Sequence, residues 1–117
     1  MSLDNPVSEG PIVVFACFRP RSPEGREELL ALMESHHELL RELDFATKRP
    51  SMVLDSTTGE GLVVEVFEWV SSFACEKAHE HERVREMWAK YDELAEFAPL
   101  KDAEGSDKPF VHWVARD

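Results

Sequence analysis

Residues 63–72 (VVEVFEWVSS) place a single carboxylate among valines and aromatic side chains. Such a run predicts a strand, and alternate residues of a strand share a face, so Glu65, Phe67 and Trp69 should point the same way. Burial raises the pKa of a carboxylate, and a desolvated carboxylate suits a base that takes the proton of a phenol or enol near neutral pH. The pattern therefore predicts that Glu65 is a catalytic base and that Phe67 and Trp69 bind a planar substrate.

A structural role for the same residues is the alternative. Glu65 would then form an ion pair with Arg19, Arg49 or a residue of a partner subunit, and Phe67 and Trp69 would only pack on an interior strand face. A buried carboxylate without any partner is very costly, so one of the two roles should hold. The sequence leaves both roles open.

The histidines offer one further catalytic candidate and no metal site. His79, in the second predicted helix, is a candidate for a second polar group of the site. His36 and His37 are adjacent, so they point about 100° apart on a helix and do not share a metal easily. The two histidines of His79-Glu80-His81 do not face each other either, and no third ligand is indicated. We therefore predict that no metal is bound.

Composition predicts one reduced, cytoplasmic domain. The chain has 117 residues, of which 43% are hydrophobic, and no apolar run approaches the ~18 residues of a membrane span. Its 13 Lys and Arg are scattered and the net charge is −11, which argues against nucleic acid and anionic membranes as partners. The two cysteines show no paired spacing. Residues 1–10 read as a flexible lead-in, and residues 11–117 as a single domain.

Periodicity predicts the order of the elements. A strand over 11–20 precedes a helix that starts at Pro23 behind the N-cap Ser22. Residues 51–70 read as two strands around a Ser/Thr/Gly turn. A second helix then runs to about Glu96 with a break near 81–83, and a loop leads to a last strand over 110–115.

This β-α-β-β-α-β order predicts the ferredoxin-like α+β fold, an antiparallel sheet with both helices on one side. Such a sheet should be apolar on one face and polar on the other. Here the strands over 11–20 and 62–69 are apolar on both faces, and two helices cover only one of them. Soluble monomers avoid large exposed apolar patches, so we predict a homodimer in which two helix-free sheet faces pack together.

Three segments resemble the antibiotic biosynthesis monooxygenase family: VVEVFEWVSSFACEKAH, VREMWAKYDELAEFAPL and the closing PFVHW. The resemblance covers residues 11–115, and its most specific part is Trp69, Ser71, Ala74 and His79. It implies a dimeric α+β barrel. Characterised oxygenases of this family act on polycyclic phenols or quinols without metal or flavin, and the anion of the substrate itself reduces oxygen.

The family's polar site residues differ in this chain. Counted from Trp69, Glu65 stands where some members have Asn, and Asp55 stands where they have His. Another branch degrades haem with a Trp and a His ligand, and those positions hold Ala78 and Trp88. The resemblance therefore implies no cofactor.

Two functions remain open at this point. The first is a cofactor-independent monooxygenase-like enzyme for a small aromatic or quinol-type substrate, with Glu65 and His79 as catalytic residues. Its substrate-binding residues would be Phe67, Trp69, Asp55 and Phe15. The second is a non-catalytic dimeric barrel that binds a small ligand or acts as a stress-type interaction module.

Overall fold

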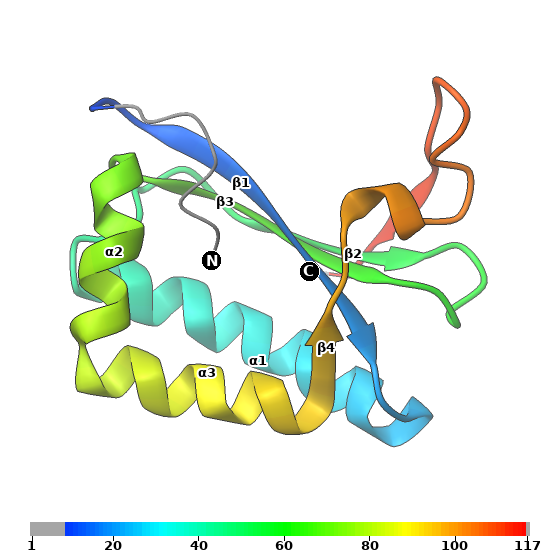
Figure 1. Ribbon diagram of the computed structural model, residues 1–117, viewed down its shortest axis with the longest axis horizontal. Helices are drawn as coiled ribbons and strands as arrows, with labels where there is room; N and C mark the ends of the chain where they lie inside the picture. Colours follow the sequence, from blue (N-terminus) through cyan, green and yellow to red (C-terminus); the bar gives the residue numbers. More distant parts are fainter. Residues whose placement is uncertain (1–8, 117) are drawn as a thin grey trace.

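The computed structural model describes residues 9–116, so most of the predicted lead-in, residues 1–8, lies outside the described part. The chain forms an α+β fold, shown in Figure 1. Its elements are β1 (Ile12–Pro20), α1 (Pro23–Glu42), β2 (Met52–Ser56), β3 (Val63–Trp69), α2 (Ser72–Glu80), α3 (Glu82–Leu94), β4 (Ala95–Phe97), the 3₁₀ turn η1 (Leu100–Asp102) and β5 (Trp113–Ala115). None of the helices within residues 9–116 has the length and apolarity needed to cross a membrane.

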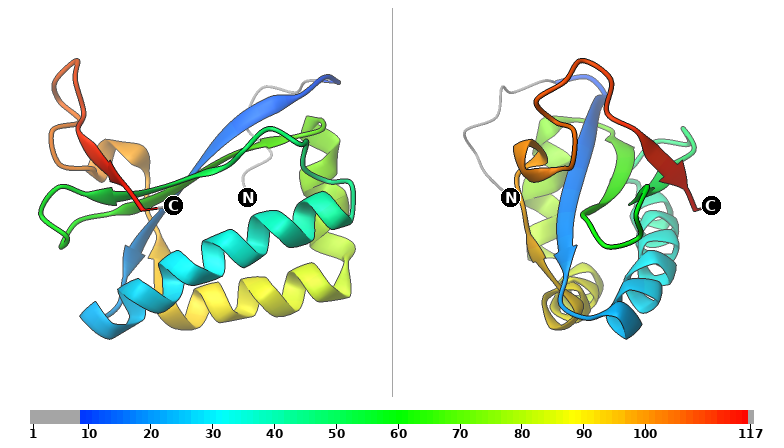
Figure 2. Two further views of the ribbon diagram at one scale, coloured as in Figure 1. Left: turned by 180° about the vertical axis from the view of Figure 1, so that it is seen from behind. Right: turned by 90° about the vertical axis from the view of Figure 1, so that its right-hand side faces the viewer.

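One antiparallel sheet organises the described residues, with strand order β4-β1-β3-β2-β5. The helices lie on one face of it, as the two views of Figure 2 show. In the register of β1 and β3, Ala16 is opposite Glu65 and Phe15 is opposite Val66. Glu65 and Ala16 therefore belong to the face covered by helices, and Phe15 belongs to the outer face.

Helix α1 begins as predicted. The Ser22 side chain accepts a hydrogen bond from the backbone N–H of Gly25 (3.0 Å), and Pro23 occupies the first turn. The buried side of the helix, which includes His36, packs against the sheet.

The predicted break between the second and third helices is confirmed. His81 has extended backbone angles (φ −87°, ψ 125°), and its ring nitrogen Nδ1 accepts from the N–H of Arg83 (3.2 Å). The helix direction changes there, so α2 and α3 run at a steep angle to each other in Figure 1. The turn directs α3 along α1 and below the sheet.

The end of the chain differs from the prediction. The helix stops at Leu94, and Ala95–Phe97 forms β4, which pairs with the end of β1. The predicted last strand over 110–115 is a strand only at Trp113–Ala115, and it pairs with β2 at the opposite edge. β4 lies on the edge of β1 opposite β3, where it provides partners for backbone groups of residues 18–20.

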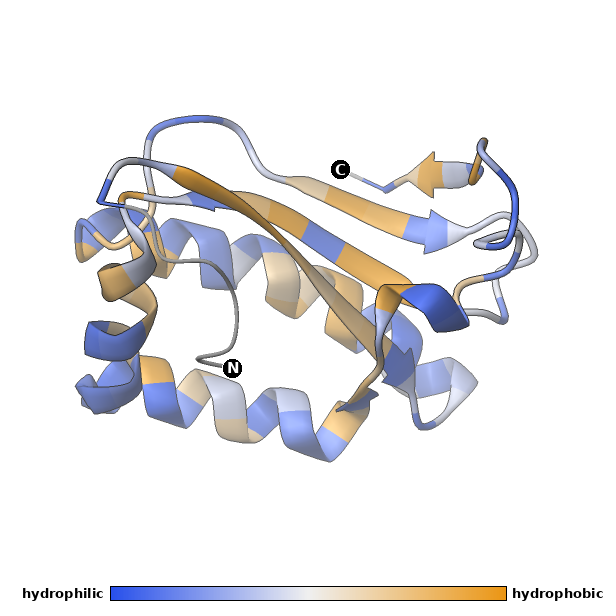
Figure 3. Ribbon diagram, turned by 45° about the horizontal axis from the view of Figure 1, so that its top comes forward, coloured by the Kyte–Doolittle hydropathy of each residue, from blue (hydrophilic) through white to orange (hydrophobic). Residues whose placement is uncertain are grey.

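The outer face of the sheet is partly covered, which corrects the expectation that it is bare. Ala103, which follows η1, and Leu62 pack with Cys17 and Val64 in a small buried cluster. The remainder, which we call the outer patch, contains Val13 (47% exposed), Phe15 (54%) and Met52 (48%), with the half-buried Val66 between Phe15 and Met52. Figure 3 shows β1 and β3 mainly in the colours of hydrophobic residues, with hydrophilic bands within β3 and at the end of β1.

Candidate functional site

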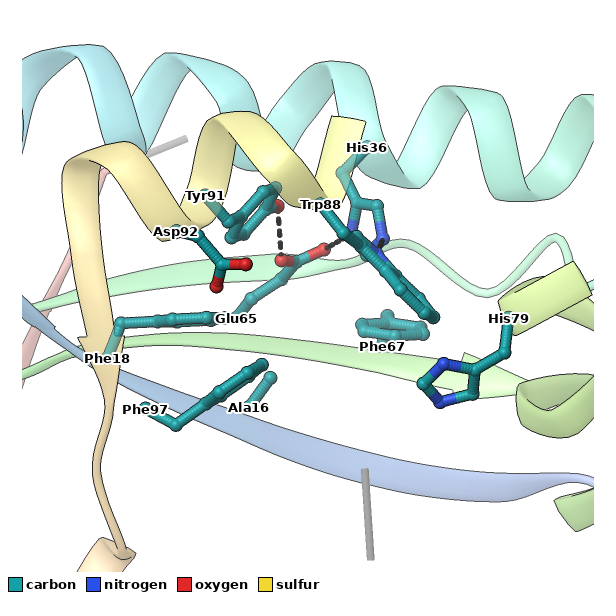
Figure 4. Close-up of a pocket in the computed structure, with 10 residues that line it drawn as sticks. All are labelled: Ala16, Phe18, His36, Glu65, Phe67, His79, Trp88, Tyr91, Asp92 and Phe97. Carbon is teal, nitrogen blue, oxygen red and sulfur yellow. Dashed lines mark hydrogen bonds and ion pairs between the residues drawn. The ribbon is translucent and has the colours of Figure 1, made fainter. Parts of the chain in front are cut away.

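A cavity of about 230 Å³ lies between the helix-covered face of the sheet and α3 (Figure 4). Its walls are mainly aromatic, and its polar groups are two carboxylates, two imidazoles, a phenol and an indole N–H. The lining residues are Ala16, Phe18, His36, Glu65, Phe67, His79, Trp88, Tyr91, Asp92 and Phe97. The volume lies below the ~300–1,000 Å³ of sites for drug-sized ligands, so it suits one ring or two fused rings.

Glu65 lies at the inner wall of this cavity and is fully buried. It occupies the middle of β3, which has β1 and β2 on either side. Its Oε2 lies 2.6 Å from Nδ1 of His36, and its Oε1 accepts a hydrogen bond from the hydroxyl of Tyr91 at 2.7 Å. The carboxylate therefore joins α1 and α3 to the sheet.

Trp88 determines the tautomer of His36. Its indole N–H donates to Nε2 of His36 at 2.8 Å, so Nε2 carries no hydrogen. The proton of the neutral imidazole is then on Nδ1, and Nδ1–H donates to Glu65. His36 and Tyr91 both offer a hydrogen to Glu65 without adding a positive charge.

Tyr91 keeps its proton. Burial raises the pKa of Tyr91 well above its usual value, and the charge of Glu65 and the hydrogen bond to it act in the same direction. The phenol is thus a hydrogen-bond donor at any physiological pH, and its ring packs 5.1 Å from the ring of Phe18.

The opening of the cavity carries the exposed side chains of His79, Asp92 and Phe97. The ring of His79 lies 4.7 Å from that of Trp88 in an edge-to-face arrangement, and burial lowers the pKa of His79. Figure 4 shows Asp92 next to Tyr91, and His79 at the far end of the site.

The structure brings three predicted site residues together: Glu65, Phe67 and His79 all line the cavity. Trp69 does not line it, because its buried ring packs against Phe67 at 4.9 Å in the core below α2. Phe15 lies in the outer patch, on the other face of the sheet.

Asp55 also lies away from the cavity, in an ion-pair network. Its Oδ1 accepts from Arg26 of α1 at 2.6 Å, and its Oδ2 accepts from Arg116 at 3.0 Å. Arg26 donates further to the carbonyl of Gly61, and Arg116 donates to Glu27. The network ties the last described residues to α1, β2 and the hairpin turn.

The two arginines considered as partners of Glu65 are engaged elsewhere. Arg19 pairs with Asp102 (3.5 Å) and Arg49 with Glu68 (3.2 Å). Neither Arg19 nor Arg49 is therefore the partner of Glu65, which bonds to His36 and Tyr91 instead.

Sequence reasoning missed the roles of His36, Trp88 and Tyr91. His36 and Tyr91 are buried and Trp88 is half-buried within α1 and α3, where aromatic side chains usually only pack. The available signal was that each has a polar group at its tip, and that such groups usually find a partner when buried. No group of three or more His, Cys, Asp or Glu that could hold a metal ion is found within residues 9–116.

A scan against protein-family models finds no match, and a search of curated proteins finds no significant match either.

Proposed function

We propose that the chain is a cofactor-independent monooxygenase-like enzyme that acts on a small aromatic or quinol-type substrate in the cavity. The observation that carries the proposal is Glu65, a fully buried carboxylate held by the uncharged donors His36 and Tyr91 at the wall of an aromatic cavity. Each carboxylate oxygen accepts one hydrogen bond and keeps lone-pair capacity for a proton. A general base must lie within hydrogen-bond reach of the group that gives it a proton, and the hydroxyl of Tyr91 lies within that reach of Oε1 of Glu65.

Tyr91 would connect Glu65 with the substrate. Because Glu65 has no exposed surface, a substrate hydroxyl would meet the hydroxyl of Tyr91 first. The substrate O–H bond breaks as its proton passes to Tyr91, and the Tyr91 O–H bond breaks as its own proton passes to Oε1 of Glu65. This step leaves a substrate anion, a neutral tyrosine and a protonated Glu65.

The substrate anion would then supply the electrons, as the resemblance to antibiotic biosynthesis monooxygenases implies. It reduces molecular oxygen, one atom of which enters a ring carbon while the other leaves as water. Overall, the substrate gains one oxygen atom and loses two hydrogen atoms, and a phenol becomes a quinone. Phe67 and Trp88 would flank the ring, and His79 would be the second polar group.

The proposal includes a homodimer. The four strands β4-β1-β3-β2 with helices on one face fit a ferredoxin-like unit, and two such units packed through the outer patch would form a dimeric α+β barrel. Light scattering at micromolar concentration should find a dimer. Phe15→Glu should convert it to a monomer, whereas Phe110→Glu, at a residue 79% exposed outside the strands, should not. A wild-type monomer would refute this arrangement.

A second candidate function is a non-catalytic dimeric barrel that binds a small ligand or serves as a stress-type interaction module. The closed network favours it: Trp88 donates to His36, and His36 and Tyr91 both bond to Glu65. Such a network can serve folding alone.

Oxygen consumption by the purified protein with a panel of dihydroxynaphthalenes, which match the two-ring limit of the cavity, separates the two functions. Glu65→Gln is the sharpest variant, because its amide oxygen can accept from His36 and its amide nitrogen can donate to the oxygen of Tyr91. We expect turnover by the wild type and none by this variant, with unchanged circular dichroism. Undiminished turnover by Glu65→Gln excludes Glu65 as the base. Absence of turnover across the panel, with ligand binding that survives Glu65→Gln, supports the binding function.

A further inference from the structure

The charged groups that line the cavity are all acidic. Glu65 and Asp92 are carboxylates, and no Lys or Arg is among the lining residues. His36 is neutral because Trp88 donates to its Nε2, and the lowered pKa of His79 favours its neutral form. Among residues 9–116, the cavity walls therefore present negative charge and no positive charge to a ligand.

Arg21, whose side chain bonds to the backbone of the lining residue Asp92, is already engaged. Arg21 donates from Nε to the backbone carbonyl of Asp92 (3.0 Å) and pairs through Nη1 with Glu96 (3.0 Å). The guanidinium of Arg21 is therefore held at the exposed surface where α3 meets β4, and Arg21 is not among the residues that line the cavity.

The aromatic walls favour the same sign of charge as the carboxylates. Five aromatic rings line the cavity, from Phe18, Phe67, Trp88, Tyr91 and Phe97. The face of an aromatic ring attracts a cation through its quadrupole, and more strongly where water is excluded. A cation in this cavity would thus meet ring faces and the exposed carboxylate of Asp92, and the buried charge of Glu65 behind Tyr91 would add to the attraction. An anion would be repelled by both carboxylates.

We propose that the cavity binds a flat ring that carries a protonated amine, in preference to the same ring carrying a carboxylate. The amine would lie toward Asp92 at the opening, and the ring would lie among the aromatic walls. The inference rests on the proposed function in one respect only, which is that the cavity binds a ligand. It does not depend on any oxygenation step. The volume of about 230 Å³ limits the ring system to two fused rings.

Calorimetric titration of the full chain at pH 7.5 with three probes of one shape tests the proposal. The probes are naphthylmethylamine, naphthylmethanol and naphthoate, which place a positive, a neutral and a negative group on the same ring system at nearly equal size. We expect the amine to bind at least tenfold more tightly than the alcohol, and the carboxylate to bind most weakly. Equal or tighter binding of naphthoate, or no binding of any probe at millimolar concentration, would overturn the proposal.

Two variants test whether the carboxylate at the opening of the cavity causes the preference for the amine. Asp92→Asn removes the carboxylate at the opening, and should weaken amine binding at least fivefold while leaving alcohol binding unchanged. Asp107→Asn makes the same change of net charge at a side chain that is 80% exposed outside the cavity lining, and should leave both affinities unchanged. Equal effects of the two variants would show that only the net charge of −11 acts, and would overturn the proposal. Selective amine binding without oxygen consumption would leave this inference intact and reject the oxygenase.

Discussion

Removal of the Tyr91 hydroxyl should cost about 1.5–3 kcal/mol of folding free energy, because this hydroxyl donates to a buried carboxylate and hydrogen bonds to charged groups contribute about that much. Tyr91→Phe keeps the ring and its packing against Phe18, so the loss measures the hydrogen bond and the desolvated oxygen left behind. For a chain of this size, 1 kcal/mol corresponds to roughly 3–6 °C in Tm.

A double-mutant cycle with Glu65→Leu isolates the contact. In the Leu background the hydroxyl has lost its acceptor, so Tyr91→Phe should be close to neutral or slightly stabilising. The difference between the two backgrounds should again be about 1.5–3 kcal/mol. Urea unfolding followed by far-UV circular dichroism, at one fixed protein concentration, provides the four free energies.

A coupling below about 0.5 kcal/mol would refute the reasoning, because that is the low end for an ordinary neutral hydrogen bond. It would mean that Glu65 does not depend on Tyr91, and that the proton path from the cavity through Tyr91 has no structural basis.

The remaining predictions concern acid stability and the ion-pair network. Nε2 of His37 is buried without a hydrogen-bond partner among residues 9–116, and burial, followed by the charge of Arg41, lowers the pKa of His37 below its unfolded value of about 6.5. The unfolded chain then binds more protons than the folded chain as the pH falls. The free energy of unfolding should therefore be constant above about pH 7 and should decrease from about pH 6.5 downward. His37→Leu should flatten this decrease, measured as the midpoint of urea unfolding at each pH, whereas the control variant His112→Gln should not. Asp55→Ala leaves Arg26 buried without its carboxylate and should cost about 3–5 kcal/mol in the same assay. Its control at the exposed pair, Asp102→Ala, should cost less than about 1 kcal/mol, and equal losses would contradict the importance of burial.

Local patterns predicted most of the fold. The N-cap Ser22, the break at His81 and the alternation along β3 are all encoded within a few neighbouring residues. The end of the chain was mispredicted because β4 is only three residues long, and its pairing with β1 depends on where α3 returns the chain to the sheet. Because the helical periodicity of the sequence continues into this short strand, the local sequence does not indicate where the helix ends.

The site was predictable only in part for a similar reason. Glu65 and Phe67 share a face by strand alternation, and both line the cavity. Asp55 and Phe15 were expected there as well, but Asp55 pairs with Arg26 and Phe15 lies on the opposite face of the sheet. For Phe15, the alternation within one strand does not say which face the helices cover. Asp55 is opposite Val63 and so lies on the covered face, but it is at another part of the sheet, beside Arg26 of α1.

By itself, the sequence determined that Glu65 would be buried beside aromatic side chains, because a strand directs alternate residues to one face and β3 is apolar on both. Only the tertiary structure decided what surrounds the carboxylate. His36 and Tyr91 are 29 and 26 residues away along the chain, and Trp88 is 52 residues from His36. Their hydrogen bonds depend on where α1 and α3 cross the sheet, and the packing of the whole core sets those crossings.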